Sequence, residues 1–214
     1  MTFRLLLLIC LTAMTTASSS ADLIFSLRPV QLTSATTGFV DLVVESDSSV
    51  DFNSFLYGID ISPVGTAPNG GLFFDTPVTD EASNPDFIFF GNSTLLPPTR
   101  LPLNQTILGG DFTASGGNVS LAATDGQRLV VRAELGFLPS LTFGDTFSIQ
   151  LVEDGFGVNQ ATPSGAGSPV PFTLGAPVSF TFGDVAAVPE PSSVAVLLTI
   201  VGGAVYRRRR QRQR

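Results

Sequence analysis

The most constraining feature of this sequence is a strict alternation of apolar and polar residues through its middle part. The segment from Arg128 to Phe137 shows the alternation best. Its apolar phase comprises Leu129, Val131, Ala133, Leu135 and Phe137, and its polar phase comprises Arg128, Arg132 and Glu134. Successive side chains of a β-strand point to opposite faces of a sheet. The segment is therefore predicted to be a strand with one buried face.

Similar alternation recurs along the chain, separated by turn-rich pieces at 62–71 and 155–171. The other apolar phases are Phe55, Tyr57, Ile59 and Ile61, then Phe147, Ile149 and Leu151, then Val178, Phe180 and Phe182, with shorter runs at 23–27, 39–44, 87–90 and 119–123. No stretch keeps an apolar period of 3.6 long enough for a good helix. We therefore predict about eight strands in a single all-β domain at 22–185, an antiparallel β-sandwich with Greek-key or jelly-roll connections.

The interval 22–190 is strongly acidic. It holds all eighteen acidic residues, four arginines and no lysine, which gives a formal charge of −14. Such a surface repels the phosphates of nucleic acids and anionic lipid head groups, since both are bound through Lys and Arg. Nucleic acid is therefore not an expected partner. A domain of about 165 residues buries enough surface to fold without disulfides, and the one cysteine, Cys10, lies near the N-terminus.

The N-terminus has the three parts of a secretory signal peptide. Arg4 supplies the positive charge, and the apolar run 5–14 is too short for a stable membrane span. Small residues follow, and we predict a signal peptide at 1–21 with cleavage after Ala21; Ala17 is the competing position, and an uncleaved anchor is the alternative. Signal peptidase is the processing partner. Lipid attachment at Cys10 is disfavoured because Leu8 and Ile9 precede it.

The C-terminus also has three parts in order. Pro189, Glu190 and Pro191 form a proline box, residues 192–206 form an apolar segment, and an arginine-rich tail occupies 207–214. A fifteen-residue helix is about 22 Å long against a hydrocarbon core of about 30 Å, so the predicted transmembrane helix is a marginal span. The tail includes Arg207, Arg208, Arg209 and Arg210. The positive-inside rule keeps these arginines in the cytoplasm and the acidic domain outside.

This arrangement resembles the PEP-CTERM sorting signal that exosortases recognise, and the resemblance covers residues 186–214. It implies that Pro189, Glu190 and Pro191 are recognition residues in a substrate. It also implies an exported bacterial protein, held at the inner membrane by its C-terminal helix until processing delivers it to the cell surface or the exopolysaccharide matrix. The alternative is an ordinary tail anchor with a proline-rich collar. Proline has no backbone N–H donor, and it disfavours the helical conformation at the residue before it. The box is therefore expected to be extended and accessible.

A second resemblance lies in the middle domain. The segment 38–75 contains an apolar strand, an acidic turn, the run Phe55-Leu56-Tyr57-Gly58-Ile59-Asp60-Ile61, and a later Phe73-Phe74-Asp75. It resembles the opening strands of cohesin-like sandwiches. The resemblance implies a binding or scaffolding module, and it transfers no contact residue.

Missing residue types limit the chemistry of the mature domain. Without histidine or cysteine there, Ser-His-Asp and Cys-His nucleophile systems and imidazole or thiolate metal sites cannot be built. Without lysine, Schiff bases and phosphate-loop nucleotide sites are excluded. A carboxylate pair acting as glycosidase acid and base is the catalytic alternative that composition leaves open. We predict a protein that is not an enzyme and has no catalytic residue.

Two acidic turns are weak calcium candidates, because calcium takes six to eight oxygen ligands. Asp47 and Asp51 belong to the first turn, and Asp80 and Asp86 to the second. Neither turn has the glycine and terminal glutamate of an EF-hand loop, and solvated acidic turns are the simpler interpretation. No other cofactor is expected.

Two hypotheses about function follow. The first is a non-catalytic envelope or exopolysaccharide-matrix protein delivered by both terminal signals. The second is an extracellular module that binds a glycan or a protein, with calcium as a candidate ligand.

Overall fold

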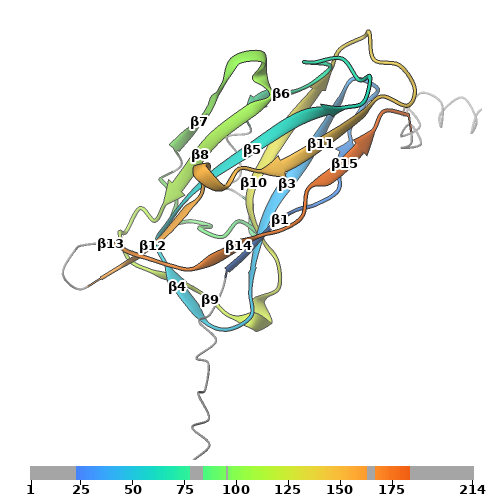
Figure 1. The fold of residues 1–214 in the computed structure, drawn as a ribbon. Coiled ribbons are helices and arrows are strands. Elements are labelled where there is room, and N and C mark those ends of the chain that lie inside the picture. The colour runs from blue at the N-terminus through green and yellow to red at the C-terminus, as the bar shows by residue number, and fades with distance from the viewer. Residues whose placement is uncertain (1–22, 78–83, 95, 163–166, 184–214) are drawn as a thin grey trace, which may run out of the picture.

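A computed structural model describes residues 23–77, 84–94, 96–162 and 167–183 (Figure 1). These residues form strands and single-turn 3-10 helices, with no α-helix in the described ranges. The elements are β1 (Leu23–Leu27), β2 (Gln31–Leu32), β3 (Thr37–Ser46), β4 (Val50–Phe52), β5 (Ser54–Val64), β6 (Leu72–Pro77), β7 (Leu96–Arg100), η2 (Pro102–Asn104), β8 (Thr106–Phe112), β9 (Val119–Leu121), η3 (Ala123–Asp125), β10 (Arg128–Phe137), β11 (Thr146–Leu151), η4 (Glu153–Gly155), β12 (Gly157–Ala161), β13 (Gly167–Pro169), β14 (Phe172–Leu174) and β15 (Val178–Thr181).

Two sheets make up the sandwich (Figure 1). The first sheet has the order β14-β1-β3-β10-β6, with β2 paired to β3. In the second sheet β5 is central: β8 and then β7 lie on one side, whereas β12 and β11 follow each other along the other side and continue to β13 and β15. A separate ribbon joins β4 and β9. The prediction of an all-β sandwich of jelly-roll type is confirmed.

One pairing departs from the antiparallel prediction. β1 and β14 pair in parallel, with Leu23 beside Phe172 and Phe25 beside Leu174. A parallel pair needs a long connection, and here almost the whole domain lies between the two strands. Alternation within a strand specifies which face is buried but not the direction of its neighbour, so the sequence pattern could not predict this pair.

Phenylalanine rings fill the space between the sheets in three groups along the strands. Phe25 and Phe156 have ring centroids 5.3 Å apart, Phe55 and Phe89 are 5.2 Å apart, and Phe137 and Phe180 are 5.4 Å apart. Each buried ring contributes about 1.5–3 kcal/mol by its removal from water. Most of the phenylalanines in the described ranges therefore pack in or against the core.

The apolar residues of β10 that were predicted to be buried are all buried, Leu129 at 4% exposure, but Leu129 does not share the face of the others. Ala133, Leu135 and Phe137 face the core, but Leu129 lies outside the core cluster while Val130 is part of it. The pairing of β10 with β3 shifts between Leu129 and Val131. A β-bulge adds one residue to a strand and reverses which face the preceding residues occupy.

Two further segments differ from the prediction. Residues 87–90 form turns instead of a strand, with Phe87 making one isolated bridge to Leu129. Conversely, the turn-rich piece 155–171 contains β12 and β13. β12 pairs with β5 from Gly157 to Asn159. Hydrogen bonds to a central strand override the weak strand propensity of Gly and Asn.

Both terminal signals lie outside the described residues. The leader at 1–21, the proline box at 189–191 and the arginines at 207–210 therefore stay predictions, as do all the boundaries assigned to them. In the ranges that the structure does describe, no helix has the length and apolar character needed to cross a membrane.

Candidate functional site

The outer face of the second sheet carries apolar side chains exposed to solvent. Leu56 on β5 is 51% exposed, Leu96 on β7 is 43% exposed and Phe112 on β8 is 39% exposed. They share this face because Phe55 and Ile107 point inward, so Leu56 and Leu108, next to them in their strands, point outward. We call Leu56, Leu96, Leu108 and Phe112 the leucine patch.

A glycine at the centre of the leucine patch lets these side chains come together. Gly110 pairs with Leu56 on one side and with Leu96 on the other. A Cβ atom at position 110 would lie 2.6 Å from Cδ2 of Leu56 and 2.6 Å from the carbonyl oxygen of Phe55. Leu56 therefore lies over a backbone that has no side chain of its own.

The other half of the same face carries hydroxyl groups, which we call the hydroxyl patch. Its members are Ser62, Thr106, Thr146, Ser148, Ser179 and Thr181, all outward in the register of β8, β5, β11 and β15. Asp60 accepts hydrogen bonds from Thr106 at 2.6 Å and from Ser62 at 3.0 Å. Thr146 and Thr181 share a further hydrogen bond of 3.1 Å. Asp60 is thus held by neighbouring hydroxyls.

The turn η4 separates the two patches. Between β11 and β12 the chain leaves the sheet and crosses its outer face over Gly58, and Val152 donates a backbone hydrogen bond to the Gly58 carbonyl at 3.0 Å. A Cβ atom at position 58 would lie 3.2 Å from Val152 and 3.4 Å from Gly155. Glu153 and Asp154 on this turn are exposed, so acidic groups border the apolar area.

The chemistry of this face is that of a protein contact surface. The centres of protein interfaces are depleted in charged residues and rich in apolar groups, with a polar rim. Among the outward positions in the two patches and between them, Asp60 is the charged side chain, and its oxygens accept hydrogen bonds from Ser62 and Thr106. Exposed apolar side chains that lie together on an otherwise acidic protein indicate an interaction site.

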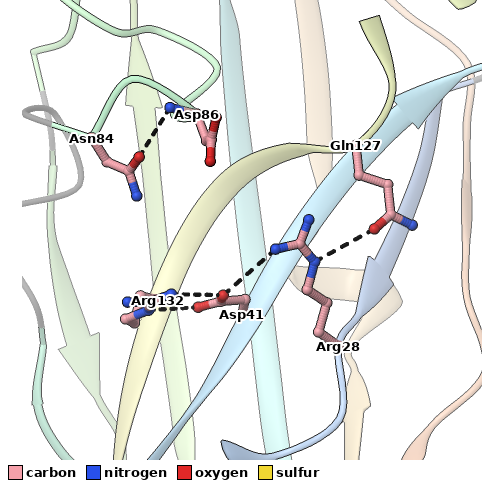
Figure 2. A network of polar contacts seen from close by, with 6 residues as sticks. All are labelled: Arg28, Asp41, Asn84, Asp86, Gln127 and Arg132. Carbon is pink, nitrogen blue, oxygen red and sulfur yellow. Dashed lines mark hydrogen bonds and ion pairs between the residues drawn. The ribbon is translucent and has the colours of Figure 1, made fainter.

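The outer face of the first sheet has a different chemistry (Figure 2). Asp41 on β3 is 2% exposed, and Arg132 on β10 binds both of its oxygens, Nε to Oδ1 at 2.8 Å and Nη2 to Oδ2 at 2.9 Å. Arg28 places Nη1 3.9 Å from Oδ2 of Asp41 and donates from Nε to Gln127 at 3.4 Å. A buried carboxylate is tolerated when cations and hydrogen bonds satisfy it.

Arg132 makes one further contact on this face. Its guanidinium carbon lies 3.9 Å from the centre of the Phe39 ring, which is a cation–π contact. The arginine therefore ties β10 to two positions of β3, at Phe39 and Asp41. These charges pair with each other within the protein, so the cluster is a structural one.

The calcium candidates are only partly described. Asp47, Asp51 and Asp86 are exposed, and Asp80 lies outside the described residues. Among the residues that the structure places, no three acidic side chains gather into a metal-binding group. In the turn at 84–87, Asn84 accepts from the backbone nitrogen of Asp86 at 2.9 Å (Figure 2), and Arg128 donates to the carbonyl oxygens of Pro85 and Asp86. The calcium hypothesis stays a prediction.

Neither the leucine patch nor the cluster of Asp41, Arg132 and Arg28 was predicted from the sequence. A signal for the first was available: Leu56 lies in the outward phase between Phe55 and Tyr57, where a polar residue is expected. No local signal existed for the second, because Asp41 and Arg132 are 91 residues apart in the chain.

Comparison with solved structures places the fold among cohesin domains. The seventh ScaB type I cohesin from Pseudobacteroides cellulosolvens has a TM-score of 0.50 at 7% identity, covering 78% of this chain and 96% of that one. The sixth cohesin from the Acetivibrio cellulolyticus scaffoldin B, solved in complex with a Cel5 dockerin, has a TM-score of 0.49 at 8% identity, covering 72% and 94%. A non-cellulosomal cohesin from Archaeoglobus fulgidus has a TM-score of 0.47 at 11% identity, covering 75% and 91%.

These identities show similarity of fold alone. No protein-family model and no curated protein sequence matches the chain. The similarity to solved cohesin structures supports the resemblance of the middle domain to cohesin-like sandwiches. The domain has a cohesin-like jelly-roll fold.

Proposed function

We propose that this chain is an exported, non-catalytic module that binds another protein through the outer face of its second sheet. The leucine patch forms the centre of the contact, and the hydroxyl patch forms a polar extension. The partner has a complementary apolar surface with hydrogen-bonding groups beside it.

The exposure of Leu56, Leu96 and Phe112 on one face is the observation that carries this proposal. Burying apolar area stabilises a complex by about 25 cal/mol per Å² before the costs of association are subtracted. The cohesin-like fold supports the proposal, because this broad sheet face carries no α-helix in the described ranges and is crossed by the single turn η4 between the two patches.

Delivery of the module to the cell surface is the second part of the proposal. The signal peptide exports the chain, and the PEP-CTERM-like tail is retained at the inner membrane for recognition by an exosortase. The order of the proline box, the apolar segment and the arginine-rich tail supports this route. The acidic body fits an exported position, since it is repelled by anionic head groups and leaves the tail as the attachment.

Site-specific photocrosslinking in the native organism tests the binding face. A benzophenone amino acid at Leu56 is expected to form a discrete covalent adduct, which mass spectrometry identifies. The matched control places the same group at Glu134, which is exposed on the opposite sheet. Equal labelling at the two positions, or labelling at position 134 alone, contradicts the proposal.

The intact mass of the protein recovered from the surface fraction tests delivery. A species that begins near Asp22 and ends near Pro191 supports export followed by sorting. A species that ends at Arg214 indicates a retained anchor and contradicts processing at the box.

A further inference from the structure

The end of the sandwich where the described chain leaves toward its C-terminus carries an exposed aromatic side chain. Phe143, in the loop between β10 and β11, is 84% exposed. Its ring lies over Gly183, the last described residue, and 6.4 Å from the ring of Phe182. Leu138 and Val64 beside these loops are 41% and 47% exposed. We call this end of the sandwich the apolar tip.

Three loops meet at the apolar tip. Leu138 donates a backbone hydrogen bond to Gly71 at 2.9 Å, which joins the loop 138–145 to the loop 65–71. Phe137 donates to Thr36 at 3.0 Å, which brings in the loop 33–36, and Gly144 donates to Phe182 at 3.0 Å. The end of β15 and all three loops therefore form one surface.

The apolar tip is almost free of charge. The loops 33–36, 65–71 and 138–145 contain one ionisable residue, Asp145, and its carboxylate accepts from the backbone and the hydroxyl of Thr142. β3 and β10 run the length of the sandwich, so the turns at their other ends lie at the opposite end of the domain. Those turns carry Asp47 and Asp125. The described loops at the end where the chain exits are thus nearly neutral in a strongly acidic domain, and the next acidic residue in the sequence is Asp184.

The chain beyond the apolar tip leads within a short distance to the apolar segment. Eight residues, 184–191, separate Gly183 from residue 192, and a chain of that length spans at most about 28 Å. A domain attached so closely to a membrane-inserted segment meets the bilayer at high effective concentration. The described loops of the end that faces the bilayer carry one carboxylate, that of Asp145, so anionic head groups repel this end less than the opposite one.

We propose that the apolar tip rests on the lipid surface of the membrane, with Phe143 inserted among the head groups. Phe and Leu side chains of membrane-surface segments are buried at the boundary between head groups and acyl chains, and Trp and Tyr are enriched at the same depth. The contact orients the domain with its strands rising from the membrane, so that the leucine patch faces sideways toward a partner. This inference rests on the membrane-retained tail proposed above.

A single tryptophan tests the contact, because the chain has no tryptophan of its own. The Phe143→Trp protein is recovered from the membrane fraction of expressing bacteria and reconstituted in phosphatidylcholine vesicles. Its emission is expected to shift to the blue and to lose intensity when lipids bearing a nitroxide quencher are included. Phe90→Trp is the matched control, since Phe90 is 52% exposed beside the bridge to Leu129, at the opposite end of β10. Its emission is expected to stay unchanged.

Flotation of the vesicles separates the two proposals. If the protein floats with the vesicles and both tryptophans respond alike, the tail anchors the chain and the tip contact is overturned. If the protein does not float, membrane retention fails, and the tip contact fails with it. A third outcome is a blue shift that grows with protein concentration while the nitroxide lipids do not quench the emission. That result would mean that the tip contacts a second copy of the chain, and it would also overturn the lipid contact.

Discussion

The two outer faces of the sandwich differ in how their side chains meet solvent: one carries charges that pair with each other, and the other carries exposed apolar side chains. On the first sheet, Asp41, Arg132 and Arg28 bind one another, and Phe39 is covered by the arginine. On the second sheet, Leu56, Leu96 and Phe112 lie exposed with no comparable cover. Charges that pair internally satisfy one another, so the domain loses stability when one partner is removed. Exposed apolar side chains contribute favourable free energy only when another molecule covers them and removes them from water.

This difference separates stability from binding. Substitutions on the first sheet are expected to change unfolding, whereas substitutions on the second sheet are expected to change partner binding.

Asp41→Asn is expected to lower the free energy of unfolding by about 2–3 kcal/mol. The substitution keeps the shape of the side chain but leaves Arg132 and Arg28 without their shared counter-charge. Urea denaturation of the span 22–185 measures the effect. Glu134→Gln on the same face is the control, because an exposed surface substitution usually changes stability by less than about 0.5 kcal/mol. Equal effects of the two substitutions would show that the cluster is not structural.

Leu56→Asp is expected to weaken partner binding by at least about tenfold, which corresponds to about 1.4 kcal/mol. The carboxylate would bring an unpaired charge to the centre of the contact. Titration of the partner identified by crosslinking measures the affinity. Because Leu56 is half exposed, the unfolding midpoint of this variant is expected to stay near that of the natural protein; a large shift would assign Leu56 to the core.

Gly110→Ala is expected to cost about 1–2 kcal/mol of stability, since the new methyl group meets the backbone of Phe55 as well as Leu56. Thermal unfolding measures this cost. Gly157→Ala is the matched control within the same sheet, because nothing lies within 4 Å of a Cβ there. An unchanged melting temperature of the Gly110→Ala protein would mean that β5 and β8 move apart to accommodate the methyl group without loss of stability.

Asp60→Asn is expected to have the smallest effect, about 0.5–1 kcal/mol on unfolding. Ser62 and Thr106 donate to different oxygens of Asp60. The asparagine oxygen still accepts from one of these hydroxyls, and its amide nitrogen can donate to the other. Binding of the partner is expected to change less than with Leu56→Asp. A greater loss of affinity from Asp60→Asn than from Leu56→Asp would move the centre of the contact to the hydroxyl patch.

Much of the fold was predictable, because alternation reports burial directly. Phe55, Tyr57, Ile59 and Ile61 are all buried, as their phase predicted. The predicted face failed at Leu129: the residue is buried, but it lies outside the core cluster because a bulge shifts the register there. The prediction also failed at residues 87–90, where apolar residues enter the core from turns. In both places the backbone departs from a regular strand, and a period of two no longer applies.

The candidate site was predicted less well. The acidic turns were predicted as calcium candidates from their composition. In the described residues, however, their side chains are exposed and do not gather into a metal-binding group. The leucine patch is inconspicuous, since each of its members lies on a different stretch of sequence. Only the register of β7, β8 and β5 brings Leu96, Gly110 and Leu56 side by side.

Residue types and their spacing are enough to predict the class of fold, the acidic and lysine-free character of the domain, and the types of catalysis that its composition excludes. These properties depend on the period of apolar residues and on residue types, both of which are local. The tertiary structure alone decided the parallel pairing of β1 with β14, the Asp41–Arg132 pair and the surfaces formed by the leucine patch and the apolar tip. Each of these joins residues far apart in the chain, and long-range pairing is set by the packing of the whole sandwich rather than by any one segment.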